Sequence, residues 1–290
     1  MSLLSLVLTV QPREAREMSS TQGRAAHATL LNAVKKVDPM LANEMHDETM
    51  PRAFTCSSLR GRRQDNKVMP EWTYSVRYTA LSAPLADLLP TLFASGTEIV
   101  LDEVPFVVIR ATSDPAQDAW AARLTYEELS ARWLLARETP ASRIELRLYS
   151  PTAFKTAGKL QILPLPDLVF GSLLAKWNTF APVALPEEAR RFAAECLVVS
   201  RLQLRSHAAP FKDESAFKSG AVGSVTYAAT ARDRYWLAVM NTLADFAQFA
   251  GLGVSTTMGM GQTRRMKAEG RRIEDESGGR KNGSADFASG

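Results

Sequence analysis

Cysteine and histidine are scarce in this chain of 290 residues. It has two cysteines, Cys56 and Cys196, and three histidines. The cysteines lie far apart in the sequence, which argues against a disulfide framework and predicts two reduced, buried thiols. So few thiols and imidazoles, at these spacings, cannot assemble a zinc site. The sequence therefore predicts no bound metal and no cofactor.

Long hydrophobic runs are also missing. No stretch reaches the ~18 apolar residues that cross a membrane, and the first ten residues are too short and too polar at their flanks for a secretory signal. We therefore expect a cytosolic, cytoplasmic protein without a membrane partner. An excess of one charge is nearly absent, with a net charge of +4 at pH 7 and a pI of about 9.1. This balance permits an anionic partner but does not require one.

Glycine is concentrated near the C-terminus. Gly251, Gly253, Gly259 and Gly261 fall within eleven residues, directly after a segment with helical periodicity. Glycine permits left-handed backbone and close approach of a ligand, and such loops offer N–H groups to phosphate. No Lys-Ser or Lys-Thr follows the last glycine and no strand precedes the first, so neither a P-loop nor a dinucleotide-binding loop is indicated. The pattern favours a polynucleotide backbone as the ligand.

The first half of the chain alternates strand and helix patterns. Apolar periodicity predicts strands over 3–10, 54–59, 72–81, 99–101 and 106–111, and helices over 23–37, 39–46 and 85–93. Asp38 is expected to cap the second helix, and Pro90 to kink or split the third. The order strand, helix, strand, strand, helix, strand is the ferredoxin-like pattern.

The same order recurs in the second half. Strands are predicted over 143–149, 196–206, 221–229 and from 262, and helices over 166–178, 187–194 and 233–250. Thr125 and Glu128 are placed for a capping box that opens a helix over 125–137. The sequence thus predicts an α+β fold of two tandem ferredoxin-like (RRM-like, βαββαβ) domains. Their expected bounds are 1–122 and 141–267, joined by a linking helix at 123–140 and followed by a polar, disordered tail at 268–290.

Three groups of residues resemble a known family. They are the glycine-rich loop Ala-Gly-Leu-Gly-Val-Ser-Thr-Thr-Met-Gly-Met-Gly-Gln at 250–262; Asp-Pro-Met-Leu-Ala-Asn-Glu-Met-His at 38–46, followed by Pro-Arg-Ala-Phe-Thr at 51–55; and Ser-Pro-Thr-Ala-Phe at 150–154, with 165–170 and Lys-Trp-Asn at 176–178. Together they resemble the CRISPR-associated repeat endoribonucleases, the sixth Cas family. The resemblance spans residues 3–266 and is most specific in the loop.

The resemblance implies a metal-independent endoribonuclease that binds CRISPR repeat RNA. Such an enzyme cuts precursor CRISPR RNA within each repeat and leaves 5′-hydroxyl and 2′,3′-cyclic phosphate ends. The alternative is a non-catalytic RNA-binding subunit of a CRISPR effector complex on the same fold. A metabolic enzyme on a ferredoxin-like scaffold would not explain the position of the glycine-rich loop.

The candidate catalytic residues are His46, His27 and Arg52. His46 occupies the position of the family's catalytic histidine and ends a short helix, where a histidine without that resemblance is usually a surface residue. His27 begins the first helix; some members carry a second histidine there and others a tyrosine nearby, where this chain has Leu31. The acid–base partner of His46 therefore stays open. Arg52 stands where many members have a lysine that would stabilise charge on the scissile phosphate, and a solvated arginine is the plain alternative.

The candidate RNA contacts fall into two sets. One is the glycine-rich loop, and the other is made of cations in expected turns and strand ends. His207 is expected to contact RNA or lie on the surface. The residues are Gly251, Gly253, Thr256, Thr257, Gly259, Gly261 and Gln262 in the loop, and Arg60, Arg62, Arg63, Lys155 and Arg205 elsewhere. CRISPR repeat RNA is the expected partner; other effector-complex subunits and a homodimer stay open.

Overall fold

The first half of the protein builds one antiparallel sheet with two helices on one face. The computed structural model describes residues 2–19, 22–46, 51–211 and 213–266, so the tail at 268–290 lies outside the described residues. The sheet has the order β3-β5-β1-β7-β6, with β8 paired to the start of β1. The elements are β1 (Ser2–Pro12), α1 (Gly23–Val37), α2 (Pro39–His46), β3 (Phe54–Cys56), β5 (Tyr74–Ala80), α3 (Ala83–Leu92), β6 (Glu98–Leu101), β7 (Val104–Thr112) and β8 (Ala122–Thr125).

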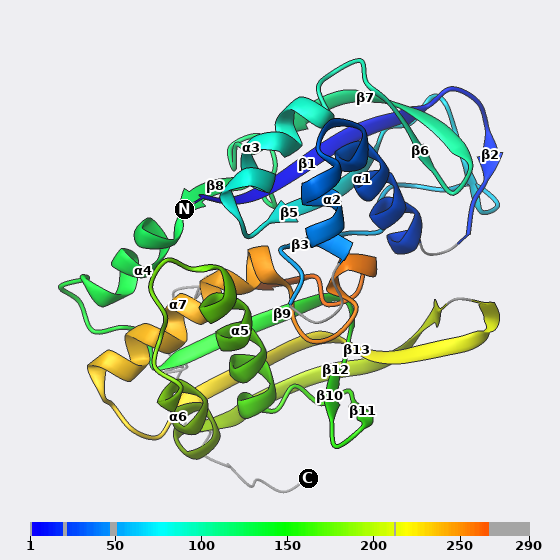
Figure 1. The fold of residues 1–290 in the computed structure, drawn as a ribbon. Helices are drawn as coiled ribbons and strands as arrows, with labels where there is room; N and C mark the ends of the chain where they lie inside the picture. Colours follow the sequence, from blue (N-terminus) through cyan, green and yellow to red (C-terminus); the bar gives the residue numbers. More distant parts are fainter. Residues whose placement is uncertain (1, 20–21, 47–50, 212, 267–290) are drawn as a thin grey trace, which may run out of the picture.

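The second half builds another antiparallel sheet, in the order β12-β13-β9-β14 (Figure 1). Its helices α5, α6 and α7 pack together over one face. The elements are α4 (Tyr126–Leu134), β9 (Arg143–Thr152), α5 (Pro166–Phe180), α6 (Glu188–Cys196), β12 (Leu197–Phe211), β13 (Asp213–Ala229), α7 (Arg234–Ala250), the 3-10 turn η1 (Thr256–Met258) and β14 (Thr263–Arg265).

Both sheets have the ferredoxin-like strand order. If the four main strands of each half are numbered along the chain, the spatial order is 2-3-1-4: β3-β5-β1-β7 in the first and β12-β13-β9-β14 in the second. In this order the two strands of each βαβ unit are separated by one strand of the other unit: β5 lies between β1 and β3, and β13 lies between β9 and β12. The tandem ferredoxin-like fold predicted from element order is therefore confirmed.

Helix starts follow the capping residues. The Asp38 carboxylate accepts from the Leu41 amide at 2.9 Å at the start of α2. Thr125 and Glu128 form the predicted capping box, with reciprocal bonds of 3.0 and 2.7 Å. The helix after Thr125 ends at Leu134, three residues earlier than predicted.

Some details differ from the sequence predictions. The helix α3 continues through Pro90 without splitting; the proline is near its C-terminal end, where few downstream turns remain to be broken. The two strands predicted over 196–206 and 221–229 belong to one long hairpin, β12–β13. The prediction also missed five short strands that have little periodicity of their own: β2 (Arg16–Glu17), β4 (Lys67–Val68), β8, β10 (Phe154–Thr156) and β11 (Lys159–Gln161). Among the described residues, no helix is long and apolar enough to cross a membrane.

A buried arginine joins the two halves. Arg77, on β5, donates from Nε to Gln262 Oε1 at 3.1 Å and from Nη1 to the carbonyl oxygen of Gln248 at 2.8 Å. Gln262 in turn donates from Nε2 to the carbonyl oxygen of Cys56 at 3.0 Å. Desolvation, together with the nearby charge of Arg60, lowers the pKa of Arg77 to about 9. The C-terminal end of α7 and the end of the glycine-rich loop are thereby docked on the first sheet.

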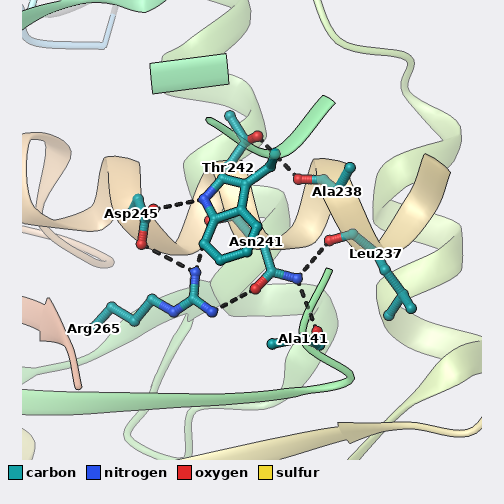
Figure 2. Close-up of polar contacts among 8 residues, drawn as sticks. Ala141, Leu237, Ala238, Asn241, Thr242, Asp245 and Arg265 are labelled. Atoms are coloured by element: carbon teal, nitrogen blue, oxygen red, sulfur yellow. Dashed lines mark hydrogen bonds and ion pairs between the residues drawn. The ribbon is translucent and has the colours of Figure 1, made fainter. Parts of the chain in front are cut away.

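A second polar network anchors the strand that follows the loop. Arg265, on β14, donates to Asp245 Oδ1 at 3.1 Å and to the side chain of Asn241, and both acceptors lie on α7 (Figure 2). Trp133 on α4 donates its indole N–H to the other Asp245 oxygen at 2.7 Å. The loop is therefore held at both ends, by α7 before it and by β14 after it.

Candidate functional site

The glycine-rich loop packs on the start of α1. A Cβ placed on Gly23, the first residue of α1, would lie 2.1 Å from the carbonyl oxygen of Met258 and 2.7 Å from the amide nitrogen of Gly259. No side chain fits into such a gap, so glycine at position 23 allows the helix and the loop to touch through backbone. In Figure 1 the loop after α7 lies beneath α2 and β3. The contact brings α1 of the first half and the loop of the second half to one site.

The glycines inside the loop serve its own packing. Gly253 has φ of +71°, and a Cβ there would lie 2.0 Å from the Ala153 carbonyl oxygen; Gly261 has φ of +69° and would meet the Leu252 carbonyl oxygen at 2.1 Å. The sequence suggested that glycine allows close approach of a ligand. The structure shows close approach of protein backbone instead.

Most amides of the loop are used within the protein. Gly251 donates to the Ala247 carbonyl oxygen at 2.9 Å, Gly261 to that of Pro151 at 3.0 Å, and Gly253 to Ser172 Oγ at 3.4 Å. Within the part of the chain that the structure describes, the amides of Thr256 and Thr257 at the start of η1 have no acceptor. Among the described residues the amide of Gly259, at the end of the same turn, likewise has no acceptor, so these three amides are the loop's candidate donors to an anion.

Gln262 has a structural environment. It is 1% exposed, and its side chain is committed to Arg77 and to the Cys56 carbonyl. Its amide donates to Ser150 Oγ at 2.9 Å. These contacts leave its side chain no path to a ligand, so we do not include Gln262 among the proposed RNA contacts.

His27 contacts the glycine-rich loop directly. This half-buried ring on α1 forms a hydrogen bond with the backbone of Thr257 and stacks obliquely on Phe54, with ring centroids 5.4 Å apart. Desolvation lowers the pKa of His27, the Thr257 bond opposes this, and the charges of Arg52 and His46 lower it further. Nδ1 of the ring is buried and has no hydrogen-bond partner among the described residues. The neutral imidazole is therefore favoured.

The charges of Arg52 and His46 reach the His27 ring, since both lower its pKa. His46 is exposed at the last position of α2, and Arg52 follows on the chain after residues 47–50, which lie outside the described residues. Arg52 Nη1 donates to the carbonyl oxygen of Met45, the residue before His46. Of the three predicted catalytic residues, His27 therefore contacts the turn η1 of the loop, and Arg52 contacts the residue before His46.

The predicted basic contacts fall into different environments. Arg62 is exposed and lies over the ring of Trp72 at 4.6 Å, whereas Arg60 is half-buried over Trp120 at 4.8 Å. Desolvation lowers the pKa of Arg60. Arg63 is committed to the protein, with bonds of 2.6 Å to the Ser19 carbonyl and 2.8 Å to Gln22 Oε1.

Two further cations line hollows of the surface. Lys155, exposed on β10, borders a groove of about 280 Å³ that is also lined by Ser172, Arg190 and Gly253. Arg205, exposed on β12, lines a hollow of about 620 Å³ on the open face of the second sheet. His207 is exposed on the same strand.

Two functional candidates escaped the sequence analysis. Arg190 on α6 reaches the Lys155 groove beside Gly171, and Lys176 on α5 donates to the loop. The signal for Lys176 was visible: it follows Leu173 by one turn on an otherwise apolar helix face. Among the described residues, no group of three or more His, Cys, Asp or Glu side chains is arranged to hold a metal ion.

Comparisons with known proteins identify this architecture. Residues 3–82 match the model of the Cas6 N-terminal domain, and residues 146–263 match that of the CRISPR-associated endoribonuclease Cas6; together the matches cover more than half of the chain. CRISPR-associated endoribonucleases Cas6 of Mycobacterium tuberculosis, from strains CDC 1551 and H37Rv, are 35% identical over 136 residues. That match covers 46% of this chain and 42% of those relatives, less than half of their length.

Solved structures are similar over nearly the whole chain. A Cas6 product complex has a TM-score of 0.75 at 26% identity, covering 92% of this chain and 100% of that one. The Cas6 of Thermus thermophilus has a TM-score of 0.69 at 22% identity, covering 92% and 99%. At that identity the second likeness is one of fold alone.

Proposed function

The chain belongs to the Cas6 family of CRISPR-associated endoribonucleases, and we propose that it processes precursor CRISPR RNA by cutting within the repeats. The observation that carries the proposal is the contact of His27 with the glycine-rich loop, where the charges of Arg52 and His46 also act on the ring. The proposed reaction is metal-independent. The ribose 2′-oxygen attacks the adjacent phosphorus and the 5′-oxygen leaves, which gives a 2′,3′-cyclic phosphate and a 5′-hydroxyl.

His27 is the proposed general base. A base must be neutral before it accepts the proton of the 2′-hydroxyl, and the lowered pKa of His27 keeps it neutral at physiological pH. The bond to the backbone of Thr257 fixes the ring against the loop. The other ring nitrogen, Nδ1, has no partner among the described residues and is the proposed proton acceptor once RNA binding exposes it. Such a positioned base contributes about 10²–10⁴-fold to the rate.

His46 is the proposed general acid. It is exposed at the last position of α2. An imidazolium there can give its proton to the leaving 5′-oxygen. Two histidines in different environments, one half-buried and one exposed, thus take opposite roles in one proton transfer cycle.

Arg52 and the loop are proposed to stabilise the phosphate in the transition state. The Arg52 guanidinium has a fixed direction because it also bonds the Met45 carbonyl. The amides of Thr256 and Thr257 add two donors at the start of η1, close to His27. Pre-oriented donors aimed at developing negative charge are among the strongest contributors to catalysis.

The remaining RNA is proposed to follow exposed cations. Lys155 and Arg190 flank the groove beside Gly253, Arg62 projects from the loop between β3 and β5, and Arg205 lies on β12. Contacts of this kind bind the sugar–phosphate backbone and position the strand without reading its sequence.

The test is cleavage of repeat RNA from the host's own CRISPR array by the purified protein in EDTA. We expect one cut per repeat, a 2′,3′-cyclic phosphate, and no cut when the nucleotide before the site carries 2′-deoxyribose. His46→Ala should bind RNA but not cut it, and the matched variant His207→Ala should cut. Binding without cutting by the wild type would refute the proposal and favour a non-catalytic RNA-binding subunit; inhibition by EDTA would refute the metal-free mechanism.

A further inference from the structure

Lys176 bonds the residues on either side of the first part of the glycine-rich loop, residues 251–255. Its Nζ lies 2.6 Å from the carbonyl oxygen of Ala250, the last residue of α7, and 3.1 Å from Oγ1 of Thr256, the first residue of η1. The last carbonyls of a helix have no partner within the helix, and a cation there also interacts favourably with the helix dipole. One amine therefore spans residues 251–255 of the loop and joins their two ends.

The bridge lies one residue from the candidate base. Thr256 accepts from Lys176, and the backbone of the next residue, Thr257, bonds His27. Thr256 is 6% exposed, and its methyl group would lie 2.9 Å from a Cβ placed on Gly261, so the residue is tightly enclosed. A displacement of Thr256 must therefore move Thr257 and change its contact with the imidazole.

A lysine is a costly choice for this position. Lys176 is half-buried on a helix face that otherwise carries Val169, Leu173 and Trp177, and desolvation lowers its pKa to about 7. A methionine would fill the same space without that penalty. The amine adds two hydrogen bonds that a methionine could not make, to the Ala250 carbonyl oxygen and to Thr256 Oγ1.

We propose that Lys176 is a positioning residue for RNA cleavage, which holds Thr256 and the end of α7 so that Thr257 fixes the His27 ring. This inference rests on the function proposed above. Lys176 does not contact the reacting atoms; it acts through the loop. Its loss should reduce the rate of the chemical step more than the affinity for RNA.

The experiment compares single-turnover cleavage and RNA affinity in matched variants. Lys176→Met keeps the volume and removes both hydrogen bonds; we expect the rate at saturating enzyme to fall roughly 10²-fold, the loss typical of a small misplacement, with little change in Kd. Lys35→Met, which removes an exposed lysine of α1, should cut like the wild type. Loss of affinity in step with the rate would overturn the proposal, as would wild-type cleavage by Lys176→Met.

A second pair of variants tests the same link if Lys176→Met does not fold. Thr256→Val keeps the shape and removes the hydroxyl, whereas Thr256→Ser keeps the hydroxyl and removes the methyl group. Thr256→Ser should cut faster than Thr256→Val, because only the serine keeps a hydroxyl that accepts from Lys176. Equal rates for the two Thr256 variants would overturn the proposal.

An NMR readout separates this inference from the proposed function. The ring signals of His27, assigned with His27→Gln, should shift in Lys176→Met and not in Lys35→Met, whether or not the protein cuts RNA. Absence of cleavage by the wild type would overturn the proposed function alone. Unchanged His27 signals in a folded Lys176→Met would overturn the positioning role alone.

Discussion

Arg52 donates a hydrogen bond to the backbone carbonyl of Met45, the residue immediately before His46. The same guanidinium lowers the pKa of His27 on the neighbouring helix. One side chain thus fixes the end of α2, where the proposed acid lies, and helps to keep the proposed base neutral. Arginine suits both tasks because it stays charged and directs several donors.

Removal of the Arg52 charge should move the pH dependence of cleavage. The base works only when neutral, so the rate should fall as pH drops through the pKa of His27, which lies below 6.5. In Arg52→Met the protonated ring loses a repulsive neighbour, its pKa rises, and the fall should begin at higher pH. Single-turnover rates from pH 4.5 to 8 measure this. Arg52→Lys retains the charge, so its rate should fall at nearly the same pH as that of the wild type. If the rate of Arg52→Met also falls at the wild-type pH, coupling between Arg52 and His27 is excluded.

Gln262 should matter for stability. Gln262→Leu leaves donors of Arg77 and the Cys56 carbonyl unsatisfied inside the protein, which should lower the free energy of unfolding by about 1–3 kcal/mol or more. Urea unfolding measures the loss. The control is Gln203→Leu, which changes an exposed glutamine on β12 and should unfold like the wild type. A stable Gln262→Leu with weakened RNA binding would show that Gln262 contacts RNA, as the sequence suggested.

Gly23→Ala should separate the loop from α1. Its Cβ would meet the Met258 carbonyl, a backbone group that cannot rotate away, so the loop or the helix must shift. We expect a lower melting temperature and slower cleavage. Gly171→Ala is the steric control for stability: its Cβ would approach only the flexible side chain of Arg190, 3.1 Å away, and alanine favours the helix. Equal melting temperatures for Gly23→Ala and the wild type would contradict the packing described.

The exposed cations should determine how RNA affinity depends on salt. Each phosphate contact adds about 0.7 to the slope of log Kd against log salt for a single strand. Arg62→Ala, Lys155→Ala and Arg205→Ala should each reduce the slope by about that amount if the residue binds one phosphate. Arg63→Ala should instead lower the melting temperature, because Arg63 holds Ser19 and Gln22. Unchanged slopes in all three variants would exclude the proposed RNA path.

Much of the fold follows from local patterns that tertiary contacts did not override. Alternation and helical periodicity located the main strands and helices, and Asp38 and Thr125 marked helix starts through capping bonds that the structure contains. The short strand β8 escaped because pairing with distant β1, and not its own sequence, makes it a strand. The strands β10 and β11 pair with each other over three residues each, too few for an alternating pattern to show.

The residues of the candidate site could be predicted from the sequence, but the contacts that position them could not. The family resemblance singled out His27, His46 and Arg52, which the fold brings together. Local reasoning about Gly253 and Gly261 considered only a ligand, whereas backbone of the protein also requires glycine there, at Ala153 far along the chain and at Leu252 within the loop. Likewise, the partners of Lys176 and Gln262 lie far along the chain, so neither role could be inferred from spacing.

The central claim is that His27 removes the 2′ proton and His46 protonates the leaving oxygen, and a repeat RNA with a 5′-sulfur leaving atom at the cleavage site tests it most directly. Sulfur leaves without a proton, so such RNA should restore cleavage by His46→Ala and not by His27→Ala. Failure to rescue His46→Ala, or equal rescue of both variants, would contradict the account.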